Sequence, residues 1–524
     1  MKKTLFCLKS FLVIVATCSL ISCGKSDGSW TDPTSDQGST TGTTTGDGSS
    51  SATTKIDSTY TSGTAEGSTE TGYDEDDLVE SSFTLASTVK IVYGSTVTVT
   101  NPLAGNGVTI TTDGNNVVIN ATVAGVAYDV SGTTSSGSLK IYSDKKFELN
   151  LNGASITSTD RPAINIQSGK TAFVVLQQGS TNSLTDAASY TSLTDGEDAK
   201  GAFFSEGQLV FSGSGALTVN GNYKHGIVSD DYIRVRTGTL NVTSTVKDAI
   251  HTNEGFIMDN GTLNLKSADD GVQVDAGYAI VNDGTITINS TGKGITADNE
   301  DEDPEVTPYV VINGGNISVT AKDEGIESKG DLTINAGNIV CNTTDDGINA
   351  ADNIYINGGK IFAYATDNDG IDANGLLTIT GGVVVAAGAR QPEASFDCDA
   401  RTFKITGGMI VGVAGATSGP TASASTVNSV ILGSGTSGQI IHIEDTDGNE
   451  VMTFKAPEAF STLIYASSKL KSSTSYKIYT GGSVASGTDF NGLYMSGTYS
   501  GGTNAGSFTT SSTVTQVGGS ISRG

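Results

Sequence analysis

Apolar and polar residues alternate in short runs along most of this chain, and each run ends at a turn-forming residue. The pattern is clear in Gly-Thr-Leu-Asn-Leu at 261–265 and in Asn-Ile-Ser-Val-Thr at 316–320, where every second residue is apolar. A period of two is typical of β-strands, and the glycine, asparagine and aspartate residues between the runs favour tight turns. Residues 223–382 contain no stretch of helical period, so the pattern predicts an all-β architecture of short strands.

One aliphatic position recurs throughout residues 223–382. Its members are Ile227, Ile250, Val272, Ile295, Ile326, Ile348 and Ile371. Their successive spacings are 23, 22, 23, 31, 22 and 23 residues, and the longest spacing contains the acidic insertion 298–308. A fixed period of this size is typical of a solenoid, in which each unit buries its apolar face only against its neighbours. We therefore predict a right-handed parallel β-helix with coils of 22–23 residues and these side chains stacked inside.

The chain divides by composition into several segments. Residues 81–436 carry the strand-like alternation of the predicted β-helix, whose coils are most regular over 223–382. Less regular alternation at its start and over residues 437–524 predicts β-rich N- and C-terminal caps, because an exposed solenoid end would be an open sheet edge. Residues 23–80 are rich in serine, threonine and glycine, which bury too little apolar surface to fold, so we expect a flexible tether.

Residues 1–22 have the pattern of a secretory signal peptide, with a basic start and an apolar run that is too short to span a membrane as a helix. The end of this segment, Leu-Ile-Ser-Cys at 20–23, resembles a bacterial lipoprotein signal. The resemblance implies that Cys23 becomes a lipidated first residue that anchors the protein in a membrane; the alternative is an ordinary cleaved signal with a chance cysteine. Gly24 resembles outer-membrane sorting, so we expect an outer-membrane lipoprotein that faces the periplasm or the medium.

The composition narrows the range of partners. The chain has 56 acidic and 29 basic residues and a formal net charge of −27, which makes nucleic acid and anionic membrane surfaces poor partners. We expect a monomer. Beyond the signal segment, the only cysteines are Cys341 and Cys398, which the strand alternation places in the core. They are interpreted as buried free thiols, with a disulfide as the alternative.

Alignment of the coils places charged residues in a column just before the repeated aliphatic position. The column consists of Asp248, Asp270, Lys293, Glu324, Asp346 and Asp369, with Asp269, Asp323, Asp345 and Asp367 close beside it. Neighbouring coils lie about 4.8 Å apart. Two carboxylates at that distance repel by roughly 1 kcal/mol in water and by more when they are partly desolvated, so some compensation is expected.

Lys293 interrupts this column and divides the carboxylates into two patches. A two-coil patch contains Asp248, Asp269 and Asp270, and a three-coil patch contains Asp323, Glu324, Asp345, Asp346, Asp367 and Asp369. Stacked carboxylates are the ligands that a hard divalent cation such as Ca²⁺ selects, so we predict calcium binding, with the three-coil patch as the leading site. The alternative is that these aspartates hydrogen-bond their own backbone at turns and remain solvated.

Several motifs occur in a fixed order along the chain. They are Leu-Asn-Leu-Asn-Gly-Ala-Ser-Ile at 149–156, Leu-Thr-Val-Asn-Gly-Asn-Tyr-Lys-His-Gly-Ile at 217–227, the Asp-Asp-Gly-Ile coils and Tyr-Lys-Ile-Tyr-Thr-Gly-Gly at 476–482. With these motifs the chain resembles secreted bacterial β-helix proteins described as carbohydrate-binding domain-containing, over roughly residues 85–518. The resemblance implies a calcium-binding right-handed β-helix with a fold like that of pectate lyases. It also implies binding of cellulose or of acidic sugars such as polygalacturonate, without demonstrated cleavage.

These observations favour a non-catalytic, membrane-tethered protein that binds plant polysaccharide, with calcium bridging its carboxylates to those of an acidic sugar. One alternative is a calcium-dependent polysaccharide lyase, which needs a base beside the bound uronate; Lys293, Lys322 and Lys329 lie near the acids but form no distinctive arrangement. His225 and His251 lie on neighbouring coils, and without a third ligand they are a weak metal or acid–base site. The other alternative is a surface adhesin or structural protein.

A neutral glucan such as cellulose needs no cation bridge but favours aromatic platforms. The candidates in this sequence are Tyr223, Tyr232, Tyr278, Tyr309, Tyr355 and Tyr364. Tyrosine in strands is also a common structural residue. The sequence therefore assigns no residue to direct contact with sugar.

Overall fold

The computed structural model describes residues 44–45, 50–191, 193–194, 196–300 and 302–522, so the expected signal peptide and Cys23 lie outside the described residues. The described chain is almost entirely β-strand, with only a short 3₁₀ helix, η1 (Glu75–Asp77), and one helical turn, α1 (Val79–Ser82). Neither helix is long and apolar enough to span a membrane. The all-β prediction is confirmed.

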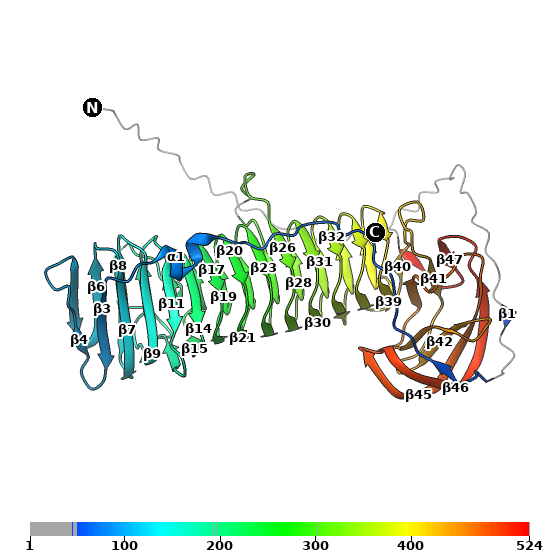
Figure 1. Ribbon diagram of the computed structural model, residues 1–524, viewed down its shortest axis with the longest axis horizontal. Helices are drawn as coiled ribbons and strands as arrows, with labels where there is room; N and C mark the ends of the chain where they lie inside the picture. The colour runs from blue at the N-terminus through cyan, green and yellow to red at the C-terminus, as the bar shows by residue number, and fades with distance from the viewer. Residues whose placement is uncertain (1–43, 46–49, 192, 195, 301, 523–524) are drawn as a thin grey trace, which may run out of the picture. The chain divides into compact units, whose positions relative to one another are not determined.

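Successive coils stack as three strands each, which form three parallel sheets along the solenoid (Figure 1). In the coil that begins at residue 225, these strands are β16 (His225–Ser229), β17 (Tyr232–Val235) and β18 (Thr239–Ser244). Each pairs in parallel with its counterpart in the next coil. The predicted parallel β-helix and its coil length are confirmed.

The strands divide among the sheets as follows. The first sheet contains β5 (Val108–Asp113), β6 (Asn115–Ala121), β8 (Gly137–Ser143), β10 (Ile164–Gln167), β13 (Gly201–Ser205), β16, β19 (Ile250–Thr252), β22 (Val272–Val274), β25 (Ile295–Ala297), β28 (Ile326–Ser328), β31 (Ile348–Ala350), β34 (Ile371–Ala373) and β37 (Phe396–Cys398). The second sheet contains β11 (Ala172–Leu176), β14 (Leu209–Gly213), β17, β20 (Gly255–Met258), β23 (Tyr278–Val281), β26 (Tyr309–Ile312), β29 (Asp331–Ile334), β32 (Ile354–Ile356), β35 (Leu377–Ile379) and β38 (Phe403–Ile405). The third sheet contains β12 (Thr181–Thr185), β15 (Ala216–Gly221), β18, β21 (Thr262–Lys266), β24 (Thr285–Asn289), β27 (Asn316–Thr320), β30 (Asn338–Thr343), β33 (Lys360–Ala365), β36 (Val383–Ala387) and β39 (Met409–Ala414).

The core is the ladder of aliphatic side chains that the repeat predicts. Ile227 pairs with Ile250, and Ile250 pairs with Val272, in register through the first sheet, and all three side chains are fully buried. Burial of each such side chain contributes about 1.5–3 kcal/mol to the free energy of unfolding. The same core holds Cys341 and Cys398, which are free thiols as the first interpretation has it.

Glycine is required where the chain turns from the second sheet into the third. Gly261 has a φ of 103°, and a Cβ added there would lie 2.6 Å from the carbonyl oxygen of Gly238 in the preceding coil. A side chain at this corner would therefore be strained by both the backbone conformation and the close approach of the neighbouring coil.

The first coils of the solenoid are built differently from the regular ones. β7 (Val126–Thr134) and β9 (Phe147–Thr157) are long strands, and β9 pairs with both β11 and β12, so it takes part in two sheets. β3 (Ser87–Tyr93) pairs antiparallel with β4 (Thr98–Thr100), and β5 pairs antiparallel with β6. These antiparallel pairs close the edges of the parallel sheets at this end.

At the other end, β44 (Thr462–Ser467) pairs antiparallel with β39 of the last coil. The remaining strands of this region are β40 (Thr417–Ser418), β41 (Ser429–Leu432), β42 (Ile440–Asp445), β43 (Glu450–Lys455), β45 (Ser475–Phe490), β46 (Leu493–Thr509), β47 (Val514–Gln516) and β48 (Ile521–Ser522). Two N-terminal strands, β1 (Thr44–Thr45) and β2 (Thr54–Lys55), pair with β46. A second apolar cluster joins Val411 and Val413 of the last coil to Phe454 and Tyr465. The C-terminal strands therefore cover the end of the solenoid.

Residues 50–83 form the N-terminal strap, which begins against β46 of the C-terminal region and from about residue 61 runs along the coils in the direction opposite to their order (Figure 1). The strap contacts a ladder of asparagines at the corner after the second sheet, namely Asn282, Asn313, Asn335 and Asn357. Asn335 Nδ2 donates to the Ser68 carbonyl oxygen over 2.9 Å and to Asn313 Oδ1 over 2.8 Å. All four amides donate in this way to one strap carbonyl and one neighbouring side chain, over 2.7–3.0 Å.

Ion pairs hold the strap at two points. In its middle, Lys404 Nζ lies 2.5 Å from a carboxylate oxygen of Glu66. Further along it, Arg234 contacts the carboxylate of Asp77 over 3.2 Å and the Gly72 carbonyl oxygen over 2.6 Å. The structure thus corrects the expected flexible tether for residues 50–80. The segment carries little apolar surface of its own, but the polar ladder beneath it satisfies its backbone.

We predict that Asn335→Ala loosens the strap. The substitution leaves the Ser68 carbonyl and Asn313 Oδ1 without their donor, which costs about 1–3 kcal/mol of unfolding free energy. Urea unfolding and the rate of limited proteolysis within residues 60–75 measure the effect. Asn264→Ala is the matched control, because Asn264 donates only to the Asn241 side chain at an exposed site away from the strap. Equal effects of the two substitutions would contradict the role of the ladder.

Candidate functional site

Two columns of side chains share the outer face of the first sheet. The strand column occupies the middle outward position of successive first-sheet strands and contains Phe204, Val228, His251, Gln273, Thr296, Glu327, Asn349, Asp372 and Asp397. The turn column lies two residues before the buried aliphatic ladder and contains His225, Asp248, Asp270, Lys293, Glu324, Asp346 and Asp369. Tyr190, Leu193 and Ala199 pack on Phe204 and Val228, so the strand column changes from apolar to polar at His251.

All four aspartates of the turn column bond the backbone of the next coil. Asp248 Oδ1 accepts the amide N–H of Asp270 over 3.1 Å, and Asp270 Oδ1 accepts that of Lys293 over 2.6 Å. Likewise, Asp346 Oδ1 accepts the amide of Asp369 over 2.9 Å, and Asp369 Oδ1 that of Ala394 over 2.5 Å. One carboxylate oxygen of each aspartate is thus used for stacking. This differs from the turn-capping alternative, in which each aspartate bonds its own backbone.

Burial makes several of these carboxyls hard to ionise. It raises the pKa of Asp270 to about 7 and, with the nearby Asp372 carboxylate, that of Asp346 to about 8. It also raises the pKa of Asp369 to about 7 and that of Asp372 to about 6, in both cases helped by the charge of Asp397. Near neutral pH the face therefore holds carboxyls that a cation would help to ionise.

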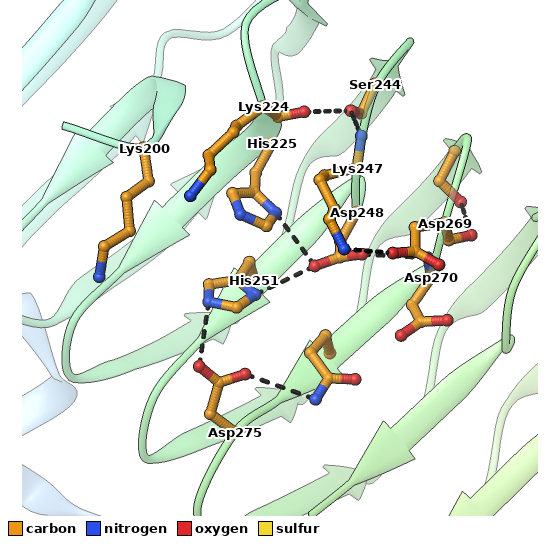
Figure 2. A network of polar contacts seen from close by, with 12 residues as sticks. Lys200, Lys224, His225, Ser244, Lys247, Asp248, His251, Asp269, Asp270 and Asp275 are labelled. Carbon is orange, nitrogen blue, oxygen red and sulfur yellow. Dashed lines mark hydrogen bonds and ion pairs between the residues drawn. The ribbon is translucent and has the colours of Figure 1, made fainter. Parts of the chain in front are cut away.

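The structure brings carboxylates together at both ends of the turn column. Oxygens of Asp248, Asp269 and Asp270 lie within 4.8 Å of one another, as the two-coil patch predicts (Figure 2). Lys247 Nζ lies 2.7 Å from Asp269 and supplies a positive charge there. Because Asp269 is already paired, this end needs less compensation by a cation.

At the other end, Asp369 lies with Asp372 and Asp397, whose oxygens are all within 4.8 Å of one another. Asn349 donates to Asp372 Oδ2 over 2.9 Å, and Ser418 Oγ donates to Asp397 Oδ1 over 2.9 Å. Asp372 and Asp397 are absent from the sequence-based prediction. Their signal is the alternation in Ile-Asp-Ala at 371–373 and Phe-Asp-Cys at 396–398, where an aspartate stands between two buried residues.

The six residues of the predicted three-coil patch do not converge on one point. Asp323 and Asp367 are exposed at turns. Asp345 Oδ1 accepts hydrogen bonds from the Asn368 side chain, over 2.5 Å, and from the Asp346 amide. Glu324 lies 3.8 Å from Lys293. Of this patch, Asp369 alone belongs to a three-carboxylate group among the described residues.

The middle of the face carries a fully buried carboxylate with two lysines. Glu327 contacts Lys293 Nζ and lies 2.5 Å from Lys329 Nζ, and Thr296 Oγ1 donates to it over 2.9 Å. Burial alone would raise the pKa of Glu327, but the two lysines outweigh it and lower the pKa. For Lys293, burial alone would lower the pKa, but the hydrogen bond to Glu327 outweighs burial and raises it. Lys293 therefore compensates carboxylates, as its place in the sequence predicts.

Two histidines flank Asp248 (Figure 2). Burial would lower the pKa of His251, but the carboxylates of Asp248 and Asp275 raise it to about 9. For His225 burial prevails and lowers the pKa. Burial opposes ionisation of Asp248 too, but the two neighbouring histidines lower its pKa. The sequence identified both histidines but not that Asp248 joins them.

The candidate tyrosine platforms are mostly tied into structural contacts. Tyr232 Oη donates to Asp77 of the strap over 2.5 Å, and the ring of Tyr355 lies against Gly67 of the strap. The rings of Tyr278 and Tyr309 stack on each other with centroids 5.4 Å apart. Tyr223 stacks on Tyr190 with ring centroids 4.1 Å apart, and Tyr364 of the third sheet packs on Phe362 with centroids 6.1 Å apart.

Comparison with known proteins identifies one matching family. A family model described as carbohydrate-binding domain-containing protein matches residues 105–363, 266–394 and 306–453, together more than half of the chain. A carbohydrate-binding domain-containing protein of Acetivibrio thermocellus is 34% identical over 115 residues, which is 21% of this chain and 40% of that protein. This chain thus spans less than half the length of that relative. A solved structure of a polysaccharide lyase-like protein from C. thermocellum is 24% identical, with a TM-score of 0.39, and covers 52% of this chain and 100% of its own.

We predict that Asp346→Asn reduces the dependence of stability on pH. Unfolded aspartate loses its proton near pH 4, whereas folded Asp346 has a pKa of about 8. Between these values the folded state binds more protons than the unfolded state, so stability falls as pH rises. Asparagine still accepts the Asp369 amide but carries no charge. In chelator, the variant should melt a few degrees above the parent near pH 8 and close to it near pH 4.

The matched control for this experiment is Asp283→Asn. Asp283 is an exposed carboxylate at a turn, where asparagine can still accept the Gly284 amide. Its thermal unfolding should keep the pH profile of the parent. A profile of Asp346→Asn that follows both the parent and this control would show that Asp346 ionises normally.

Proposed function

The chain belongs to the family of carbohydrate-binding domain-containing proteins, and from this premise we propose that it is a non-catalytic, membrane-tethered protein that binds acidic plant polysaccharide with calcium. The sugar class is exemplified by polygalacturonate. The tether is the lipid that the sequence predicts on Cys23, at the outer membrane. Calcium binds at the carboxylate end of the first sheet, formed by Asp369, Asp372 and Asp397.

The observation that carries this proposal is the convergence of three carboxylates on one outer face. Their oxygens lie within 4.8 Å of one another, and burial raises the pKa of Asp369 to about 7 and of Asp372 to about 6. A set of oxygen donors with uncompensated charge fits a hard cation such as Ca²⁺. Asn349 and Ser418 hold Asp372 and Asp397 in place from outside the group.

The charge of the protein supports a role for the cation in recognition. At a formal charge of −27 the chain should repel a polyuronate. Bound calcium supplies positive charge that can contact protein and sugar carboxylates at once. Since Asp372 and Asp397 occupy the outward column of adjacent strands, they present this charge on the face of the first sheet.

Two further observations support binding of an acidic sugar without cleavage. A lyase needs a base beside the bound uronate, but Lys293 and Lys329 both contact Glu327. A neutral glucan such as cellulose needs exposed aromatic platforms, but Tyr232 and Tyr355 contact the strap. We therefore place polygalacturonate ahead of cellulose, and binding ahead of the lyase or adhesin alternatives.

We predict that the chain from Gly24 onward is retained on immobilised polygalacturonate in calcium and released by chelator. Asp372→Asn should weaken retention by about tenfold or more, because it removes one of three converging charges at a site where asparagine can still meet Asn349. Affinity electrophoresis in polygalacturonate, in parallel with cellulose pull-down, measures retention. Absorbance of unsaturated uronides is followed in the same samples.

Asp283→Asn is the matched control, since it removes an equal charge at an exposed turn outside the first sheet. It should bind like the parent. Equal losses of retention in the two variants would show that net charge alone causes the effect, and would contradict a site at Asp372. Formation of unsaturated product would make the protein a lyase, and absence of retention on either glycan would leave the adhesin alternative.

A further inference from the structure

The two histidines of the first sheet converge on one carboxylate oxygen (Figure 2). His225 begins β16, Asp248 lies at the equivalent position of the next coil, and His251 is in the middle of β19. His225 Nδ1 and His251 Nδ1 each lie 3.0 Å from Asp248 Oδ2. One nitrogen of each ring and a carboxylate oxygen of Asp248 all lie within 4.8 Å of one another. The coil stacking thus assembles a set of two nitrogens and one oxygen.

Hydrogen bonding leaves this group incompletely satisfied. His225 is 5% exposed and Asp248 is 4% exposed. His251 Nδ1 has a hydrogen bond with Asp248 Oδ2. His225 Nδ1 points into the same cluster but makes no hydrogen bond of acceptable geometry, despite its short distance to that oxygen. A buried ring nitrogen without a partner, close to a carboxylate that also contacts a second imidazole, is in position to act as a metal ligand.

We propose that His225, Asp248 and His251 bind a divalent transition metal ion of the zinc type, at a site separate from the calcium site. In tetrahedral zinc coordination, metal–ligand distances near 2.0–2.1 Å separate the ligand atoms by about 3.3 Å. The two nitrogen-to-oxygen separations of 3.0 Å are already close to that value. The two rings stack with centroids 4.2 Å apart and an interplanar angle of 28°, so an ion bound to both nitrogens also requires the rings to turn relative to each other.

Outer contacts orient two of the three ligands. His251 Nε2 lies 3.2 Å from Asp275 Oδ2, which leaves Nδ1 as the nitrogen that faces Asp248. Asp248 uses its other oxygen, Oδ1, to accept the Asp270 amide. A carboxylate on the far nitrogen of a ligating imidazole is the usual support of such a ligand in metal sites. These contacts keep His251 Nδ1 and Asp248 Oδ2 directed toward each other.

The donor set distinguishes this site from the carboxylate group at the other end. Imidazole nitrogens favour zinc, copper, nickel and related ions, whereas calcium selects oxygen ligands. Asp248 Oδ2 already has a hydrogen bond with His251 and Oδ1 accepts a backbone amide, so little remains for calcium there. Three protein ligands leave a further coordination position for water. The two ends of the face are thus predicted to bind chemically different ions.

The test uses the chain from Gly24 onward, purified without a histidine tag and stripped with chelator. The protein has only 3 histidines in all, so few other nitrogen sites compete for the added metal. Titration with ZnCl₂ should show one tight site, and CoCl₂ should give the intense visible absorption of a low-coordinate, nitrogen-ligated ion. His225→Ala and His251→Ala should each weaken zinc binding by more than about 100-fold, and Asp275→Asn by about 10–100-fold.

Asp269→Asn is the matched control, because Asp269 lies beside Asp248 but is not one of the three ligands. It should keep the zinc affinity and the cobalt spectrum. Circular dichroism and thermal unfolding establish that each variant is folded. If a histidine variant does not fold, the cobalt spectrum of the unchanged protein decides the question. Weak absorption typical of oxygen-only coordination, absence of zinc binding, or equal affinity in folded His→Ala variants would overturn the proposal.

Discussion

The parallel, in-register pairing of successive coils is the constraint on which the rest of this structure depends. It places every position of one coil about 4.8 Å from the same position of the next. For the aliphatic ladder that includes Ile227, Ile250 and Val272, repetition is favourable because each side chain buries its neighbours. For a charged or polar position, the same repetition stacks like groups on one another, and each such column needs its own source of compensation.

The polar columns meet this requirement in different ways. In the asparagine ladder, the side chains bond one another and their second N–H groups hold the N-terminal strap, as Asn335 does with Asn313 and Ser68. In the turn column, Asp346 accepts the next coil's backbone amide. At the centre of the face, lysines balance Glu327. Among the described residues of this face, ligand atoms converge at the end around His225, where a buried ring nitrogen has no hydrogen bond, and at the end around Asp372, where three carboxyls meet. These are the places where we infer cations.

The repeat made the fold predictable, because a single aliphatic position at a spacing of 22–23 residues specifies coil length, strand content and core together. The candidate site could be predicted from the sequence only in part. Alignment of turns found Asp369 but not Asp372 or Asp397, since those side chains reach the group from the middle of strands and only the register of neighbouring coils reveals it. The strap was missed because its composition resembles a linker. The sequence feature that indicates the strap is the asparagine that repeats at the corner after the second sheet, for example at Asn313 and Asn335.

This account of the protein depends on carboxyls of the first sheet that still hold part of their protons at pH 6–7 and lose them when a cation binds. The most direct measurement is the release of protons when calcium is added to the chelator-stripped protein, obtained by calorimetry in buffers of different ionisation enthalpy. Because Asp369 has a pKa of about 7 and Asp372 of about 6, we predict net proton release on calcium binding near pH 6.5 that disappears near pH 9. Calcium binding with the same heat in every buffer near pH 6.5 would contradict it.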